Sequence, residues 1–346
     1  MRVMPSRTTT NKVEEAQSAG RHTGMKRARE LGGLLTKSER RDGVALFARE
    51  LERRFGCIKD LFEEPSVKVI TRSFLNQGDL ADLFAHRACA VHVPGFYPAQ
   101  AAAGAAARLE GQSTQNWKVS SPRGLESSDV LSVGKPFNVA ASEGPESVAA
   151  YFDRALSNMR WWRDNGGEAG QQQHQSPLLG PLDKLRLELD EVWPEGASVR
   201  KNEEGKAFLA GVARVMRGPT RYVDGFIHVD ELAPMVESSG TFSANVYLKV
   251  PPTGGELAVW PLAVRSRWDF YRHAETLSHL TVQGEEGQAL LRRKLPPPRV
   301  IKVAPGDLVV LCVQRPHAAQ GFPMGTRVSV QSFLTFEKGK ALLLDN

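Results

Sequence analysis

The sequence has little cysteine. Its 346 residues include three, Cys57, Cys89 and Cys312, which form neither a CxxC pair nor an even set. This number and spacing exclude the disulfide framework on which small secreted domains depend. We therefore expect buried thiols in a reducing compartment.

Long apolar runs are also absent. No window of the sequence approaches the ~18 uninterrupted apolar residues of a membrane helix, and the N-terminus has no apolar run of the secretory type. The sequence thus predicts a cytoplasmic protein with no membrane partner. Its content of 41% apolar residues is still enough to bury a core that offsets the entropy of ordering the chain, which excludes disorder as the main state.

The net positive charge is small outside the N-terminus. Of the net charge of +6, residues 1–30 contribute four, from seven Lys or Arg against three Glu, and residues 31–346 contribute two. A groove that follows phosphates needs clustered Lys and Arg interleaved with stacking aromatics, and we find no such cluster. We therefore expect no nucleic-acid partner. Residues 1–25 have no apolar period and are predicted to form a disordered polar tail.

Residues 26–346 are predicted to form a single composite domain that opens with a helical preface, residues 26–200. Apolar spacing or alanine content predicts helices at residues 26–62, 98–109, 145–162 and 178–192. Strand-like runs interrupt them at residues 67–74, 88–96 and 129–137, and residues 165–176 form a Gly/Gln-rich loop.

After Trp193 the pattern changes to short β-type runs separated by Gly and Pro. They span residues 207–216, 226–229, 243–250, 256–260, 300–303, 308–313 and 327–336. Many short strands without long intervening helices predict an antiparallel double-sheet jelly roll. The predicted fold class is α+β, mainly β, with a core at about residues 207–336 and the N-terminal helices bracing its outer face.

Three side chains suggest a metal site. His228 and Asp230 flank one residue, so in an extended segment they point to the same side, and His317 follows the run at residues 308–313. Two His and one carboxylate on one face of an octahedral ion leave three adjacent positions open, an arrangement that suits non-haem Fe(II).

Ten residues after His317 comes Arg327, with Ser329 two positions further on the same face of a predicted strand. A buried guanidinium is costly unless an anion meets it, and its planar fork suits a carboxylate. The whole pattern therefore predicts a site for a metal plus a dicarboxylate.

With these residues the sequence resembles the Fe(II)/2-oxoglutarate-dependent dioxygenases, over roughly residues 207–336. The resemblance implies a double-stranded β-helix, a jelly-roll variant, with His228, Asp230 and His317 as iron ligands. It further implies that Arg327 and Ser329 hold the C5 carboxylate of 2-oxoglutarate, and that Asn245 or Tyr247 or both contact this co-substrate. The segments Gly254–Leu257 and Pro305–Asp307 look like turns of that family.

The resemblance implies an enzyme that uses O2 to oxidise an unactivated C–H bond and releases succinate and CO2. Hydroxylation is favoured over halogenation because Asp230 is present, while desaturation, ring closure and epimerisation stay open. A small polar metabolite, such as an amino acid or natural-product intermediate, is the expected substrate. Two alternatives are a jelly-roll module that binds a metal or ligand without oxidising it, and a protein- or nucleic-acid-modifying oxygenase that docks through its basic tail.

Candidate substrate contacts are fewer and weaker. They are Arg214, Arg217, Trp268, Gln331 and Phe333. For an arginine, the common alternative is an exposed surface pair that contributes little. The sequence gives no indication of the oligomeric state.

Overall fold

The computed structural model describes residues 37–63, 67–164, 179–282 and 284–346. The chain divides into two compact units, residues 1–56 and 57–346. The described part of the first unit contains helix α2, Lys37–Phe55. The predicted tail at residues 1–25 and the predicted loop at residues 165–176 lie outside the described residues.

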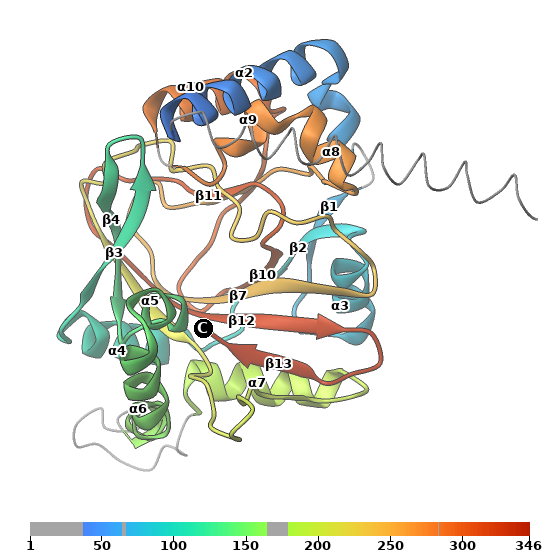
Figure 1. The fold of residues 1–346 in the computed structure, drawn as a ribbon. Helices are drawn as coiled ribbons and strands as arrows, with labels where there is room; N and C mark the ends of the chain where they lie inside the picture. Colours follow the sequence, from blue (N-terminus) through green and yellow to red (C-terminus); the bar gives the residue numbers. More distant parts are fainter. Residues whose placement is uncertain (1–36, 64–66, 165–178, 283) are drawn as a thin grey trace, which may run out of the picture. The chain divides into compact units, whose positions relative to one another are not determined.

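The second unit holds every strand that the structure describes, and most of them form one ten-stranded mixed sheet (Figure 1). The main path runs in the order β1-β2-β10-β7-β12-β6-β4-β3, and β13 and β5 continue from β12. The bounds are β1 Lys68–Thr71, β2 Ala88–Val93, β3 Gln115–Ser121, β4 Gly124–Val133, β5 Ala197–Val199, β6 Val212–Arg217, β7 Ser239–Lys249, β10 Leu308–Cys312, β12 Thr326–Glu337 and β13 Leu342–Asp345.

A smaller sheet has the order β11-β8-β9, from His317–Ala319, Leu257–Val259 and Arg299–Ile301. An isolated bridge between His228 and His317 extends it by one segment. From β6 to β12 the chain passes repeatedly between the two sheets, with only β8 and β9 following each other in the same one, which is the winding of a double-stranded β-helix. Apolar side chains of both sheets, such as Val259 and Leu311, pack in one cluster between them.

The other face of the large sheet packs against three helices, α3 (Gln77–Phe84), α4 (Ala99–Glu110) and α7 (Pro181–Val192). In Figure 1, α7 runs along β13 on this side. Alternate strand residues such as Val215, Val246 and Val330 point to the helices because side chains of a strand alternate between its faces. Burying each such side chain contributes about 2 kcal/mol, so this layer stabilises the sheet that carries the site.

Several predicted boundaries differ from the observed ones. The strand predicted at residues 129–137 is the second half of a hairpin, β3–β4, and it ends at Val133 because Gly134 has a φ of 90° and Pro136 lacks an N–H. Helix α5 (Phe137–Glu143) then leads to α6 (Pro145–Asp164). The run at residues 226–229 is paired at one bridge and is not a regular strand.

The segment between β8 and β9 folds into three short helices, α8 (Arg267–Arg272), α9 (Ala274–Ser278) and α10 (Glu285–Lys294). A 3-10 helix, η1, covers Ile58–Leu61. Leu61, Leu277 and Leu291 share an apolar cluster with Ile227 and Val229. These helices therefore back the segment that carries His228. None of the helices within the described residues is both long and apolar enough to cross a membrane.

Candidate metal centre and its two cavities

The segment before β7 presents His228 and Asp230 by simple alternation. Ile227 and Val229 point into an apolar cluster, with 1% and 7% of their surface exposed, so the two polar side chains between and after them point the opposite way. Gly225 makes the entry turn with a φ of 72°, and a Cβ atom there would collide with the backbone carbonyl of Ala319. A residue with a side chain does not fit at this position.

Backbone hydrogen bonds connect this segment to the distal histidine. The N–H of His228 donates to the carbonyl of His317 at 3.0 Å, and the N–H of His317 donates back at 2.9 Å. The N–H of Asp230 donates to the carbonyl of Val313 at 3.1 Å. Two segments almost ninety residues apart in sequence are thereby held in a fixed register.

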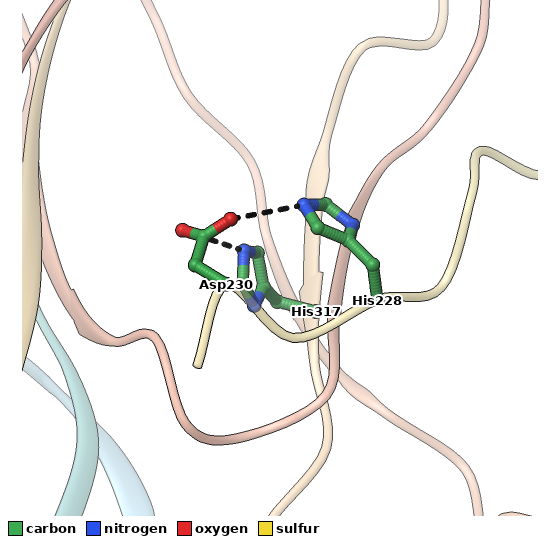
Figure 2. Close-up of side chains that lie close together, drawn as sticks. All are labelled: His228, Asp230 and His317. Atoms are coloured by element: carbon green, nitrogen blue, oxygen red, sulfur yellow. Dashed lines mark ion pairs between the residues drawn. The ribbon is translucent and has the colours of Figure 1, made fainter. Parts of the chain in front are cut away.

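Figure 2 shows the result, with the three side chains pointing toward one another. Potential ligand atoms of His228, Asp230 and His317 all lie within 4.8 Å of one another. The Nε2 atom of His228 is 3.6 Å from Oδ1 of Asp230, and the Nε2 atom of His317 is 3.8 Å from Oδ2. Two nitrogens and one oxygen that converge in this way fit the 2-His-1-carboxylate set, which leaves metal positions open for other ligands.

Both imidazoles are held in the form that binds metal. Nδ1 of His228 lies 3.0 Å from the carbonyl of Phe226, and Nδ1 of His317 lies 2.9 Å from that of Arg315. A carbonyl accepts only, so Nδ1 carries the proton and Nε2 keeps its lone pair. Burial lowers the pKa of His317 to about 4, His228 adds to this, and Asp230 opposes it. His317 is therefore neutral at physiological pH, as a ligand must be.

The first of two cavities next to the triad, here the sheet cavity, lies against the inner face of the large sheet. Register explains its lining, because Ser329 pairs with Tyr247 and Gln331 pairs with Asn245, which places these side chains on one face with Arg327. The lining residues are Val130, Arg214, Met216, His228, Asp230, Ser243, Asn245, Tyr247, Leu257, Leu311, His317, Ala319, Arg327, Ser329 and Gln331.

Arg327 lines the sheet cavity, and only 6% of its surface is exposed. Its Nη2 donates to the hydroxyl of Tyr247 at 3.3 Å, and its guanidinium lies over that ring at 5.0 Å. Its Nε and Nη1 are buried and have no hydrogen-bond partner among the described residues. Burial raises the pKa of Tyr247, so this hydroxyl stays neutral and does not satisfy the cation. Arg327 therefore presents buried N–H groups to which no carboxylate of the described residues is hydrogen-bonded.

Comparisons with known proteins were made on the whole chain. No family model and no curated protein matches it. It is similar to the solved structure of an N-substituted L-amino acid dioxygenase from Burkholderia ambifaria, at 15% identity over 78% of this chain and 91% of that chain, with a TM-score of 0.47.

Two further similar structures have lower TM-scores. A prolyl-4-hydroxylase from Pseudomonas putida gives 16% identity over 75% of this chain and 96% of that chain, with a TM-score of 0.33. HygX from Streptomyces hygroscopicus, solved with nickel and 2-oxoglutarate bound, gives 13% identity over 78% and 96%, with a TM-score of 0.35. At such low identities and TM-scores, the function proposed below rests on the geometry of the site.

The second cavity, here the hairpin cavity, has a volume of ≈ 180 Å³ and shares Arg214, Met216, His228 and Asp230 with the sheet cavity. The β3–β4 hairpin and the loop before His228 form its walls. The lining residues are Val119, Ser128, Asp129, Val130, Arg214, Met216, Thr220, Arg221, Tyr222, Gly225, Phe226, His228, Asp230, Ala319 and Gly321. Both cavities thus open on the same side chains of the triad.

Among the candidate substrate contacts, the structure brings Arg214 and Gln331 to the triad and leaves three others outside both cavities. Arg217 is exposed and has the opposite strand parity to Arg214. Trp268 is 51% exposed on α8. Phe333 has the parity of Gln331 and pairs with Ser243 of β7 and Asp345 of β13, but its side chain lines neither cavity.

Sequence reasoning missed Ser243 and the hairpin. The hydroxyl of Ser243 accepts from Nε2 of Gln331 at 2.6 Å and from Nδ2 of Asn245 at 3.0 Å, so it fixes both amides in the cavity wall. The sequence did offer an indication for Ser243, because it lies two residues before Asn245 and therefore on the same face of one strand. It offered none for Val119, because no strand was predicted at residues 115–121.

Proposed function

We propose that the protein is a non-haem Fe(II)- and 2-oxoglutarate-dependent dioxygenase, which oxidises an unactivated C–H bond of a small molecule with release of succinate and CO2. One observation carries this proposal. The ligand atoms of His228, Asp230 and His317 converge next to a buried Arg327 whose Nε and Nη1 have no partner among the described residues. A metal site and an unsatisfied cation in one cavity call for a chelating dicarboxylate.

In this proposal, Nε2 of His228, Nε2 of His317 and the carboxylate of Asp230 hold the iron. Bound iron would supply the activation of O2 that is coupled to the oxidative decarboxylation of 2-oxoglutarate. The carbonyls of Phe226 and Arg315 keep each imidazole in the binding tautomer and fix its ring orientation. The chain thus supplies a preformed ligand set, so little ordering has to accompany metal binding.

Arg327 would hold the distal carboxylate of 2-oxoglutarate through its buried guanidinium, whose Nε and Nη1 have no partner among the described residues. The neutral hydroxyl of Tyr247 and that of Ser329 would donate to the same group. Two fixed N–H donors from one planar group orient a carboxylate more strongly than a lysine ammonium does. The other end of the co-substrate would then face the triad across the same cavity.

Apolar side chains keep water away from this region. Leu257, Leu311 and Met216 line the sheet cavity between the polar groups. Low water content strengthens the pairing of a carboxylate with Arg327 and protects reactive species from side reactions. The substrate would enter through the hairpin cavity, whose volume of ≈ 180 Å³ suits a small metabolite such as an amino acid or a natural-product intermediate. Hydroxylation is the proposed outcome, because Asp230 occupies the third ligand position.

A binding assay tests the proposal directly. Anaerobic protein mixed with Fe(II) and 2-oxoglutarate should show the visible absorption band of an iron-bound 2-oxoglutarate chelate, and O2 should then yield succinate. Asp230→Asn should lose the band because an anionic ligand is lost, whereas exposed Glu231→Gln, one position further, should keep it.

The Arg327→Ala variant tests the contact with the co-substrate. It should leave the affinity for Fe(II) unchanged and weaken the binding of 2-oxoglutarate at least tenfold, since a buried charge-assisted contact contributes about 2 kcal/mol or more. No band in the unaltered protein, or full succinate production by the Asp230→Asn variant, would disprove the assignment.

A further inference from the structure

A side-chain amide covers the edge of the His228 segment that faces away from β11. The backbone N–H and carbonyl of His228 are bonded to His317, so those of Ile227 point to the opposite edge, as they do in alternate residues of an extended segment. No strand in the described part of the chain pairs with that edge. Instead, Oε1 of Gln288 on α10 accepts from the N–H of Ile227 at 2.8 Å, and its Nε2 donates to the carbonyl of Ile227 at 2.9 Å. The amide thus replaces the peptide group of a neighbouring strand.

The burial of Gln288 shows that these two contacts are the reason for a polar residue here. Only 2% of Gln288 is exposed, and Leu291, three residues further on the same face of α10, packs in the apolar cluster that contains Ile227. A buried amide is costly unless its donor and acceptor are both bonded. Ile227 supplies a partner for each.

The first contact reaches the imidazole of His228 through one peptide group. The N–H of Ile227 and the carbonyl of Phe226 belong to the same rigid plane. This carbonyl accepts the proton of Nδ1 of His228 at 3.0 Å. By holding the N–H, Gln288 fixes the direction of the carbonyl, and a hydrogen bond at one end of a peptide strengthens the bond at the other. The ring is therefore oriented by a chain of contacts that begins on α10.

The second contact acts on the next peptide group. The carbonyl of Ile227, which Nε2 of Gln288 holds, shares its plane with the N–H of His228. That N–H donates to the carbonyl of His317 at 3.0 Å. The same amide therefore also supports the register between the segments of two proposed metal ligands.

Arg292, one turn after Gln288, holds the start of the segment. Its Nη2 donates to the carbonyl of Gly225, and its Nε lies 3.8 Å from Oδ2 of Asp224. Residues four apart lie on one face of a helix. Helix α10 thus contacts the segment at two points before His228, and Gln288 is the one that bonds the peptide next to the ligand.

We propose that Gln288 is a positioning residue of the metal centre, which orients the imidazole of His228 through the peptide between Phe226 and Ile227 and thereby sets the affinity for the metal. This role rests on the proposed function, because it requires that His228 binds the metal. Helix α10 then belongs to the site although none of its side chains lines either cavity.

Zinc binding and NMR test this role together. Zn(II) is the probe, because it takes imidazole and carboxylate ligands and is diamagnetic. In the Zn(II)-loaded unaltered protein, the Nδ1–H protons of His228 and His317 should both exchange slowly with water, because each is bonded to a carbonyl. Calorimetry of the metal-free protein gives the affinity for Zn(II).

Two variants of Gln288 separate its roles. Gln288→Met keeps the length of the side chain and removes both hydrogen bonds, so the affinity for Zn(II) should fall about tenfold or more and the Nδ1–H of His228 alone should exchange faster. In either protonation state, Gln288→Glu keeps an oxygen for the N–H of Ile227. It should restore most of the affinity and the slow exchange at His228.

Leu185→Ala is the control for lost stability. It truncates a fully buried side chain of α7, on the other face of the large sheet, and should lower the stability in urea while leaving the affinity for Zn(II) intact.

Three results would overturn the inference. They are an unchanged affinity for Zn(II) in Gln288→Met, an equal loss of affinity in Gln288→Met and Gln288→Glu, and loss of the fold in metal-free Gln288→Met, which would make Gln288 a structural residue only. An unaltered protein that binds Zn(II) but shows no iron-bound 2-oxoglutarate band would instead remove the proposed function and leave the role of Gln288 in metal binding.

Discussion

At the scale of single residues, Arg315 connects the metal ligands to the protein interior. Its side chain is fully buried, and its Nη2 donates to Oε2 of Glu63 at 2.9 Å and to the carbonyl of His86 at 3.0 Å. Its own carbonyl faces Nδ1 of His317 at 2.9 Å. The guanidinium thus anchors the turn that orients a proposed iron ligand.

This anchoring predicts a stability difference between two variants of one ion-pair cluster. Glu63→Gln should destabilise the protein by about 3 kcal/mol, because it leaves the buried charge of Arg315 uncompensated. Arg265→Gln removes the exposed partner of the same carboxylate and should cost less than about 1 kcal/mol. Urea unfolding measures both. Equal losses of unfolding free energy in the two variants would show that the buried Glu63–Arg315 pair stabilises the protein no more than the exposed Glu63–Arg265 pair does.

At the scale of elements, strand parity explains why part of the site was predictable. Arg327, Ser329 and Gln331 alternate on one long strand, so their shared face followed from the sequence, and the structure places all three in the sheet cavity. The hairpin did not follow, because β3 is mostly polar and its apolar alternation is limited to Trp117 and Val119, which is too short to predict a strand. Phe333 shows the limit of this reasoning. Alternation along a strand predicts the face of the sheet on which a side chain lies, but not how far the cavity extends along that face.

The turn at Gly225, in the loop before His228, leads to a prediction about Fe(II) binding. Gly225→Ala should weaken Fe(II) binding at least tenfold, because the new Cβ meets the carbonyl of Ala319 and displaces the segment that carries two ligands. Gly205→Ala is the control, since Gly205 has a similar φ, 78° against 72°, and open space around it. It should cost about 1 kcal/mol of stability and leave metal affinity intact. Equal metal affinity in the two variants would contradict the proposed role of the turn.

At the scale of the whole molecule, two sheets enclose the site while helices cover the opposite face of the larger sheet. The double-stranded winding was predictable from the many short runs between Gly and Pro. The helices α8 to α10 were not, because their burial depends on Ile227 and Val229, which are distant in sequence. The branch of the large sheet that β13 and β5 form beside β12 depends on a parallel pairing that no local sequence pattern predicts.

The buried His86 predicts a pH dependence of global stability. Burial lowers its pKa to about 4, with a further contribution from Arg315. The unfolded chain, with an ordinary pKa of about 6.5, takes up the proton first. Stability is therefore fully present above pH 6.5 and falls as the pH drops toward 4, by up to about 3 kcal/mol.

His86→Asn isolates this contribution. Asn tolerates the positive φ of 59° at this position and does not titrate. Unfolding free energies at pH 7 and pH 5 should differ less in the variant than in the unaltered protein. An unchanged difference would mean that another group is responsible.

In the proposed enzyme, one ferrous ion lies between His228, Asp230 and His317, and these side chains also face a dicarboxylate that Arg327 binds. Anomalous diffraction at the iron edge, from crystals grown anaerobically with Fe(II) and 2-oxoglutarate, tests it most directly. We expect one iron peak bonded to Nε2 of His228, Nε2 of His317 and the carboxylate of Asp230, with the distal carboxylate of 2-oxoglutarate on Arg327. A peak away from these ligands, or 2-oxoglutarate bound without contact to Arg327, would contradict the account.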